Sequence, residues 1–312
     1  MKCLNNIILI NLFCLFLLST SCSADIQVFT CEPEWQALAI ELGGDKISSF
    51  SATSGMQDPH QVQARPSLIS KIRNADLLIC SGADLEIGWL PLLLRRAGNQ
   101  KLQPNKVGHF FAADHVRLLG IPKIIDRNQG DVHAAGNPHV QTNPKNILRI
   151  AKALLKNMKK IDPANAQFYQ NRANLFLQKW KQALKKWQLK IEQIKGENVI
   201  VQHSNWDYLF DFSKLNQVAT IEEKPGIPAT SGHLSALIKQ LKMNSAKIII
   251  VAAYQDQRAS QWLSSHTSLK VVILPFTIGG NKQVVDLFSL YDQTFTLLVN
   301  AILNQRKEVL SI

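Results

Sequence analysis

The stretch "KIIIVAA", residues 247–253, is apolar at every position after its first lysine. A strand with one wet face alternates polar and apolar side chains, so an unbroken run is typical of a parallel strand covered on both faces. Helical patterns separate this stretch from similar short runs, including the patterns at 231–243 and 290–305. The similar runs are "NVIVQ" (198–202), "QVATI" (217–221) and "KVVIL" (270–274). The second half is therefore predicted to be an α/β unit with a mostly parallel sheet flanked by helices.

The first half follows the same plan, although the sequence shows no internal repeat. Helices are predicted at 33–42 and 65–74, and strands at 26–31, 46–50, 76–81 and 123–126. Between the halves lies a helical region, about 143–195, broken near 159–167. Its second part carries an apolar stripe at helical spacing, made of Phe168, Leu175, Phe176, Trp180, Leu184 and Trp187. Thirty helical residues span about 45 Å, enough to run the height of a two-domain protein.

These patterns predict two α/β lobes joined by one long backbone helix. We expect an N-terminal lobe at 25–142, a linking helical region at 143–196 and a C-terminal lobe at 197–312. Ligands of parallel sheets bind beyond the carboxyl ends of the strands. The ligand is therefore expected in the cleft between the lobes.

The first 24 residues have the pattern of a secretory signal peptide. Lys2 precedes an almost unbroken apolar stretch from Ile7 to Leu18, and small residues follow up to Ala24. Twelve apolar positions are too few to span a bilayer as a helix. We expect cleavage after Ala24 and a periplasmic mature protein, with lipid anchoring through Cys22 as the alternative.

The net charge of +12 arises from spread positive residues, which are densest at 179–190. A nucleic-acid-binding protein would concentrate them in a stripe with aromatic support, so this stretch is interpreted as a solvated helix face and no nucleic-acid partner is expected.

Cys31 and Cys80 each end an expected strand, and these strands would be neighbours in a parallel sheet. In an oxidising compartment they favour one disulfide, with two buried thiols as the alternative.

Three of the eight histidines share one context, because each lies where the chain leaves an expected strand toward the cleft. His60 ends "DPH", His139 ends "NPH", and His203 directly follows the strand at 198–202. Neutral imidazoles from separate loops suit Zn²⁺ and, less well, other divalent metals. The carboxylates nearest to them in sequence, which would orient the rings, are Asp58, Asp131 and Asp207.

The other histidines carry weaker signals. His133 lies six residues before His139, and its alternatives are a supplementary ligand, a partner of a ligand, or loop packing, with the last two favoured. The remaining four, assigned to the surface or to helix caps, are His109, His115, His233 and His266.

Four stretches resemble, in order, the metal-binding solute-binding proteins of ABC importers, the zinc and manganese cluster. They are "QDPHQVQARPSLISKIRNADLLICSGADLEIGWLPLLL" (57–94), "GDVHAAGNPHV" (130–140), "VQHSNWDYLF" (201–210) and "EEKPGIPATSGHLSALIKQLK" (222–242). The resemblance implies a monomer that holds one divalent ion between its lobes and delivers it to an ABC permease in the inner membrane. It places the metal ligands at His60, His139 and His203, and the third histidine resembles zinc-type members, since manganese-type members more often carry a carboxylate there.

The chain departs from this family pattern twice. Many relatives place an aspartate ligand in the loop after the last strand, where Phe276 and Thr277 stand here. The fourth ligand is then water, Asp256 or Glu222. The chain also lacks the long loop rich in histidine and acids that some zinc-binding members carry.

Two function classes use the same three histidines. The first is a receptor that binds zinc without chemistry, which the resemblance favours. The alternative is a periplasmic zinc-dependent hydrolase, which needs an open coordination position and a placed acid or base. The chain has no HExxH motif, but Asp58, Asp131 and Asp207 leave this alternative open. An adhesin would be a third class, and no residue pattern favours it.

Overall fold

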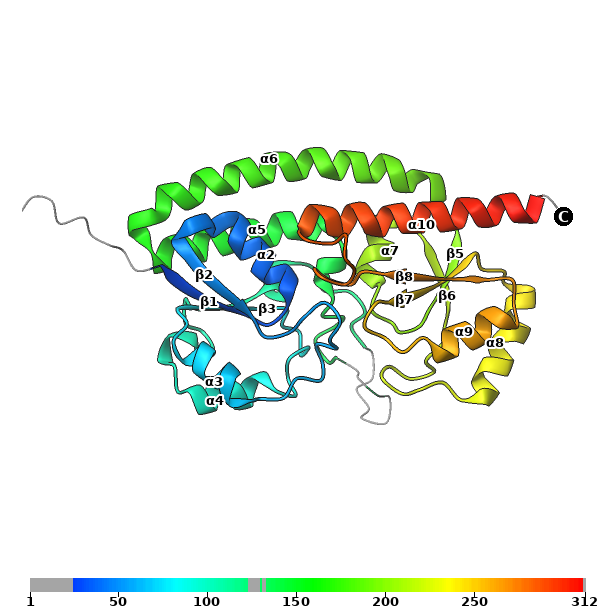
Figure 1. The fold of residues 1–312 in the computed structure, drawn as a ribbon, viewed down its shortest axis with the longest axis horizontal. Helices are drawn as coiled ribbons and strands as arrows, with labels where there is room; N and C mark the ends of the chain where they lie inside the picture. The colour runs from blue at the N-terminus through cyan, green and yellow to red at the C-terminus, as the bar shows by residue number, and fades with distance from the viewer. Residues whose placement is uncertain (1–24, 123–129, 131–132, 311–312) are drawn as a thin grey trace, which may run out of the picture.

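The computed structural model describes residues 25–122, 130 and 133–310. The expected signal peptide at 1–24 and the expected strand at 123–126 lie outside these residues. The described chain contains two four-stranded parallel sheets flanked by helices (Figure 1). The predicted fold class is confirmed.

The first sheet has the strand order β2-β1-β3-β4, and every neighbouring pair is parallel. Its central strand β3 is buried at all four positions, as its sequence LLIC requires. The strands are β1 (Ile26–Thr30), β2 (Ile47–Ser51), β3 (Leu77–Cys80) and β4 (His109–Phe111). The helices of this lobe are α2 (Pro33–Gly43), α3 (Pro66–Arg73) and α4 (Leu90–Ala97). The sequence did not predict β4, because three residues are too few to show a pattern.

The second sheet repeats this topology in the order β6-β5-β7-β8. Its central strand β7 is buried at all five positions, which confirms the interpretation of the apolar run at 247–253. The strands are β5 (Asn198–Val201), β6 (Asn216–Thr220), β7 (Ile248–Ala252) and β8 (Lys270–Leu274). The helices are α7 (Asp207–Ser213), α8 (Ser231–Met243) and α9 (Arg258–Ser265).

Three long helices form a layer over both sheets, and α6 runs along the top of both lobes with α10 beneath it (Figure 1). They are α5 (Pro144–Ile161), α6 (Ala166–Ile191) and α10 (Leu287–Leu310). Trp180 and Trp187 of α6 are fully buried, and both rings pack against Phe288 and Tyr291 of α10. The apolar stripe is therefore packing surface except at Leu175, which is exposed. No helix in the described part of the chain is long and apolar enough to cross a membrane.

A disulfide joins Cys31, the residue after β1, to Cys80, the last residue of β3, as predicted. Both cysteines are fully buried. The bridge ties the two central strands of the first sheet at their carboxyl ends, the edge that faces the cleft.

Candidate metal centre

Four histidine side chains from three loops gather between the two sheets, with His133 and His139 on the same loop. The ring centroids of His133, His139 and His203 lie 5.3, 5.4 and 6.2 Å from that of His60. One ring nitrogen from each of His60, His133 and His139 lies within 4.8 Å of the other two. The rings of the three histidines singled out from the sequence therefore lie near one another, but the nitrogen that lies within 4.8 Å of those of His60 and His139 belongs to His133 and not to His203.

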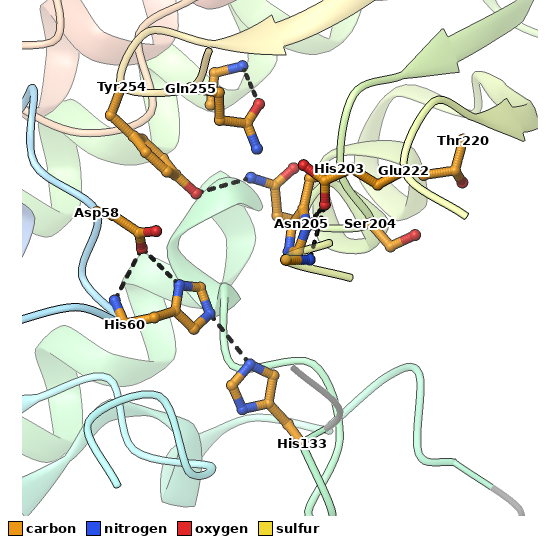
Figure 2. Close-up of polar contacts among 12 residues, drawn as sticks. Asp58, His60, His133, His203, Ser204, Asn205, Thr220, Glu222, Tyr254 and Gln255 are labelled. Carbon is orange, nitrogen blue, oxygen red and sulfur yellow. Dashed lines mark hydrogen bonds and ion pairs between the residues drawn. The ribbon is translucent and has the colours of Figure 1, made fainter. Parts of the chain in front are cut away.

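His60 is held by the aspartate two residues before it. Asp58 Oδ1 accepts hydrogen bonds from the His60 backbone N–H at 3.0 Å and from Nδ1 at 2.8 Å (Figure 2). Burial opposes ionisation of Asp58, but its contacts with His60 outweigh burial and leave the pKa of Asp58 below its ordinary value. A carboxylate on Nδ1 keeps the proton there, so the lone pair of His60 Nε2 points toward the other imidazoles.

The intervening Pro59 anchors the same loop to the first lobe. The Trp89 indole N–H donates a hydrogen bond to the Pro59 carbonyl oxygen at 3.1 Å, and Trp89 is 2% exposed. The loop that carries His60 is therefore fixed to the first core from behind. Proline further limits the backbone freedom that positioning a ligand would cost.

His139 is the most deeply buried of the four, with 1% of its surface exposed. Asn137 Oδ1 accepts a hydrogen bond from its backbone N–H at 2.9 Å, and its ring packs edge-on against Phe276 at 5.1 Å. Burial, together with His60, His203 and His133 nearby, lowers the pKa of His139 well below its ordinary value, so the ring is neutral. Its Nδ1 is buried and has no hydrogen-bond partner among the described residues. A neutral imidazole with an unused nitrogen fits a metal ligand.

His203 follows β5 and is oriented by Glu222. The distance from His203 Nδ1 to Glu222 Oε2 is 2.7 Å (Figure 2), and the same carboxylate oxygen accepts the Gly226 N–H at 2.8 Å. Glu222 was an alternative for the fourth ligand, but these contacts make it the carboxylate that positions His203. The pair repeats the arrangement of Asp58 with His60.

His133, for which the sequence favoured a partner of a ligand or loop packing, lies against His60. Its Nε2 lies 3.3 Å from His60 Nε2 (Figure 2). The backbone turns back after it, because the Gly136 N–H donates to the His133 carbonyl oxygen at 3.1 Å. Packing of a loop side chain, one favoured alternative, does not describe this contact with another imidazole. The signal in the sequence was the pair of glycines, Gly130 and Gly136, on either side of His133.

The acidic candidates Asp256 and Asp207 have other partners. Asp256 forms an exposed ion pair with Arg258 at 2.5 Å, although both residues line the cavity beside His203. Asp207 accepts a hydrogen bond from Asn137 Nδ2 at 3.1 Å and so acts on His139 only through Asn137. Asp131 lies outside the described residues.

Phe276 and Thr277 do not replace the aspartate that many relatives carry. The ring of Phe276 packs against His139, Trp206 and Tyr254, so it forms an apolar wall beside the imidazoles. The Thr277 hydroxyl points elsewhere and donates a hydrogen bond to the buried carboxylate of Glu34 in α2.

A cavity of about 560 Å³ opens beside the histidines, and its lining comes from both lobes. Asp58 and His60 line one side, and His203, Glu222 and Tyr254 line the other. The predicted cleft is therefore present, and it gives a small solute access to the imidazoles. Three carboxylates line the cavity, those of Asp58, Glu222 and Asp256, against the single guanidinium of Arg258, and this balance favours a cation over an anion.

Comparisons with known proteins agree with this geometry. The family model of the zinc-uptake complex component A periplasmic proteins, ZnuA, matches residues 28–301. The metal ABC transporter substrate-binding lipoprotein ScbA of Streptococcus cristatus is 24% identical over 242 residues, which cover 76% of this chain and 74% of ScbA. The iron ABC transporter substrate-binding lipoprotein MtsA of Streptococcus pyogenes serotype M1 is 24% identical over 245 residues, 76% of this chain and 74% of MtsA.

A manganese ABC transporter substrate-binding lipoprotein, PsaA of Streptococcus pneumoniae, is 24% identical over 271 residues, 85% of this chain and 84% of PsaA. The crystal structure of ZnuA superposes with a TM-score of 0.75 at 19% identity, covering 88% of this chain and 98% of ZnuA. The Cd-bound periplasmic metal binding protein from Candidatus Liberibacter asiaticus gives 0.72 at 16% identity, with the same coverage. The match over 28–301 shows that this chain belongs to the ZnuA family, which comprises metal-binding substrate-binding proteins of ABC transporters and not enzymes.

Proposed function

We propose that this protein captures zinc, with His60, His139 and His203 as ligands, and delivers the ion to the permease of an ABC importer. The observation that carries the proposal is the convergence of the three rings, two of them oriented by carboxylates on Nδ1. Imidazole nitrogen suits Zn²⁺, whereas Mn²⁺ prefers carboxylate, carbonyl and water oxygens. The relatives named for manganese and iron make the metal a question for experiment.

The location and partners follow from the same proposal. Residues 1–24 would act as the signal peptide, so the receptor would work in the periplasm, either free or anchored through Cys22. It would act there as a monomer. The ion would be held between lobes at 25–142 and 197–312, with 143–196 as the connecting helical region.

The test is a zinc and manganese titration of chelator-stripped protein, with affinity measured by competition against a chromogenic chelator. Zinc should bind at one ion per chain and raise the melting temperature by mass action. His60→Ala, His139→Ala and His203→Ala should each weaken zinc binding. His266→Ala is the matched control, because His266 is exposed and stacks on Trp262 at the end of α9.

Each outcome has a definite meaning. Unchanged zinc affinity in one histidine variant would remove that residue from the ligand set. Unchanged affinity in all three variants would refute the site. Tighter binding of manganese than of zinc would refute the choice of metal while leaving the receptor function in place.

A further inference from the structure

The distance between the two Nε2 atoms of His60 and His133 is that of two ligands on one ion. Tetrahedral zinc with Zn–N bonds of about 2.05 Å holds its nitrogen ligands about 3.3–3.4 Å apart. The structure places His60 Nε2 and His133 Nε2 3.3 Å apart. Because Asp58 keeps the proton of His60 on Nδ1, the facing Nε2 of His60 presents a lone pair.

His133 also shares a cavity with the other two histidines. A cavity of about 140 Å³ is lined by His133, His139 and His203, together with Asn137 and Pro225. His133 therefore contacts His60 directly and faces the same space as His139 and His203. No other side chain of the described residues is placed to close a four-nitrogen set.

The backbone on both sides of His133 is fitted to its surroundings. A Cβ on Gly130, where φ is +82°, would lie 2.1 Å from the Pro225 carbonyl oxygen. A Cβ on Gly136, where φ is +117°, would lie 2.8 Å from the Leu119 carbonyl oxygen. Only glycine fits such approaches, so Gly130 and Gly136 each lie tightly against a backbone carbonyl of another segment.

One loop of the second lobe supports both His133 and His203. Glu222 at its start binds His203 Nδ1 and the Gly226 N–H, and Pro225 between them packs on Gly130. Gly130, three residues before His133, therefore lies against the same loop that orients His203. A freely exposed loop histidine would have no such support.

We propose that His133 is the fourth metal ligand and that a four-imidazole set selects zinc over manganese. The proposal rests on the proposed function and replaces the three alternatives for the fourth ligand, water, Asp256 and Glu222. A set of four nitrogens favours zinc, cobalt or nickel, and it offers none of the oxygen ligands that manganese prefers. His133 would thus take the coordination position that Phe276 and Thr277 leave without a ligand.

The experiment compares zinc and manganese affinities of the unaltered protein, His133→Ala and the control His266→Ala. Loss of a group that only orients a ligand costs about 10–100-fold, so loss of a ligand should weaken zinc binding at least about 100-fold. Manganese affinity should change only a few-fold, which narrows the preference for zinc. In parallel, X-ray absorption at the zinc edge should count four imidazoles in the unaltered protein and three in His133→Ala.

Failure of this proposal differs from failure of the proposed function. If His133→Ala keeps its zinc affinity and its imidazole count while His60→Ala loses zinc, then His133 is not a ligand and the receptor function stands. If zinc affinity is the same in His60→Ala, His133→Ala and His266→Ala, then the metal site itself is refuted. Equal losses of zinc and manganese affinity in His133→Ala would refute the selectivity.

Discussion

Removal of the charge on Glu222 tests whether a carboxylate behind an imidazole sets the metal affinity. Glu222 Oε2 lies 2.7 Å from His203 Nδ1 and accepts the Gly226 N–H at 2.8 Å. In Glu222→Gln the amide oxygen can take the place of Oε2 and still accept both hydrogen bonds, but the negative charge is lost. The variant therefore isolates the contribution of charge from that of shape.

The magnitude follows from the class of hydrogen bond that is lost. Hydrogen bonds to charged groups contribute about 1.5–3 kcal/mol and neutral ones about 0.5–1.5 kcal/mol, so the substitution costs about 1–1.5 kcal/mol. That difference corresponds to roughly a 5–15-fold weaker metal affinity. Glu222→Ala removes both hydrogen bonds and should fall at the upper end of the 10–100-fold range typical of such partners, roughly 100-fold.

The neighbouring Glu223 supplies a matched control, because it is exposed and Glu223→Gln changes the net charge equally. The assay is chelator competition at constant ionic strength, with melting temperatures of the metal-free proteins measured alongside. Glu222→Gln should bind more weakly than Glu223→Gln, while the metal-free proteins melt at similar temperatures. Equal metal affinities of the two variants would show that long-range charge alone accounts for both losses, and would refute a specific effect of the carboxylate behind His203.

Three further predictions concern protons and covalent structure. Zinc affinity should fall as the pH drops from about 7.5 to 5, because protons compete for imidazoles whose ordinary pKa is about 6.5; an affinity that stays flat over this range in a chelator titration would contradict a histidine site. Burial raises the pKa of Glu34 to about 7, although the Thr277 hydroxyl opposes this, so its stabilising contribution is present below the ordinary pKa and is lost as the pH rises through about 7. Glu34→Gln should therefore gain up to about 3 kcal/mol of unfolding free energy relative to the parent between pH 5 and pH 8, and a pH-independent difference in urea unfolding would refute this. Replacement of both Cys31 and Cys80 by alanine opens a loop of 49 residues and should cost about 4 kcal/mol in the same assay, whereas a cost near zero would show that the bridge constrains little.

The parts of the fold that sequence predicted well are those with long apolar runs. The strand at 270–274 and the helix at 231–243 match β8 and α8 residue for residue. The break between α5 and α6 was also predicted. Pro163 begins the short turn there, and Asp162 Oδ1 accepts the Asn165 N–H at 3.3 Å.

The missed elements depend on contacts that sequence does not display. Strand β4 has only three residues, His109–Phe111, and it is defined by pairing with β3. A pattern of period two needs more positions than that before it differs from a loop.

In the metal centre, too, the sequence predicted some of the contacts and missed others. The contexts of His60 and His139, each directly after a proline, drew attention to rings that do converge with His203. The contact of His133 with His60 spans 73 positions of the chain, and no local spacing encodes it. The role of Glu222 likewise depends on the side-by-side ends of β5 and β6.

An anomalous-difference map of zinc-loaded crystals, recorded at the zinc absorption edge, is the most direct test that three histidines bind one zinc ion between the lobes. We expect one dominant peak there, about 2.0–2.1 Å from ring nitrogens of His60, His139 and His203. A dominant peak elsewhere, or one out of bonding reach of these three rings, would contradict it.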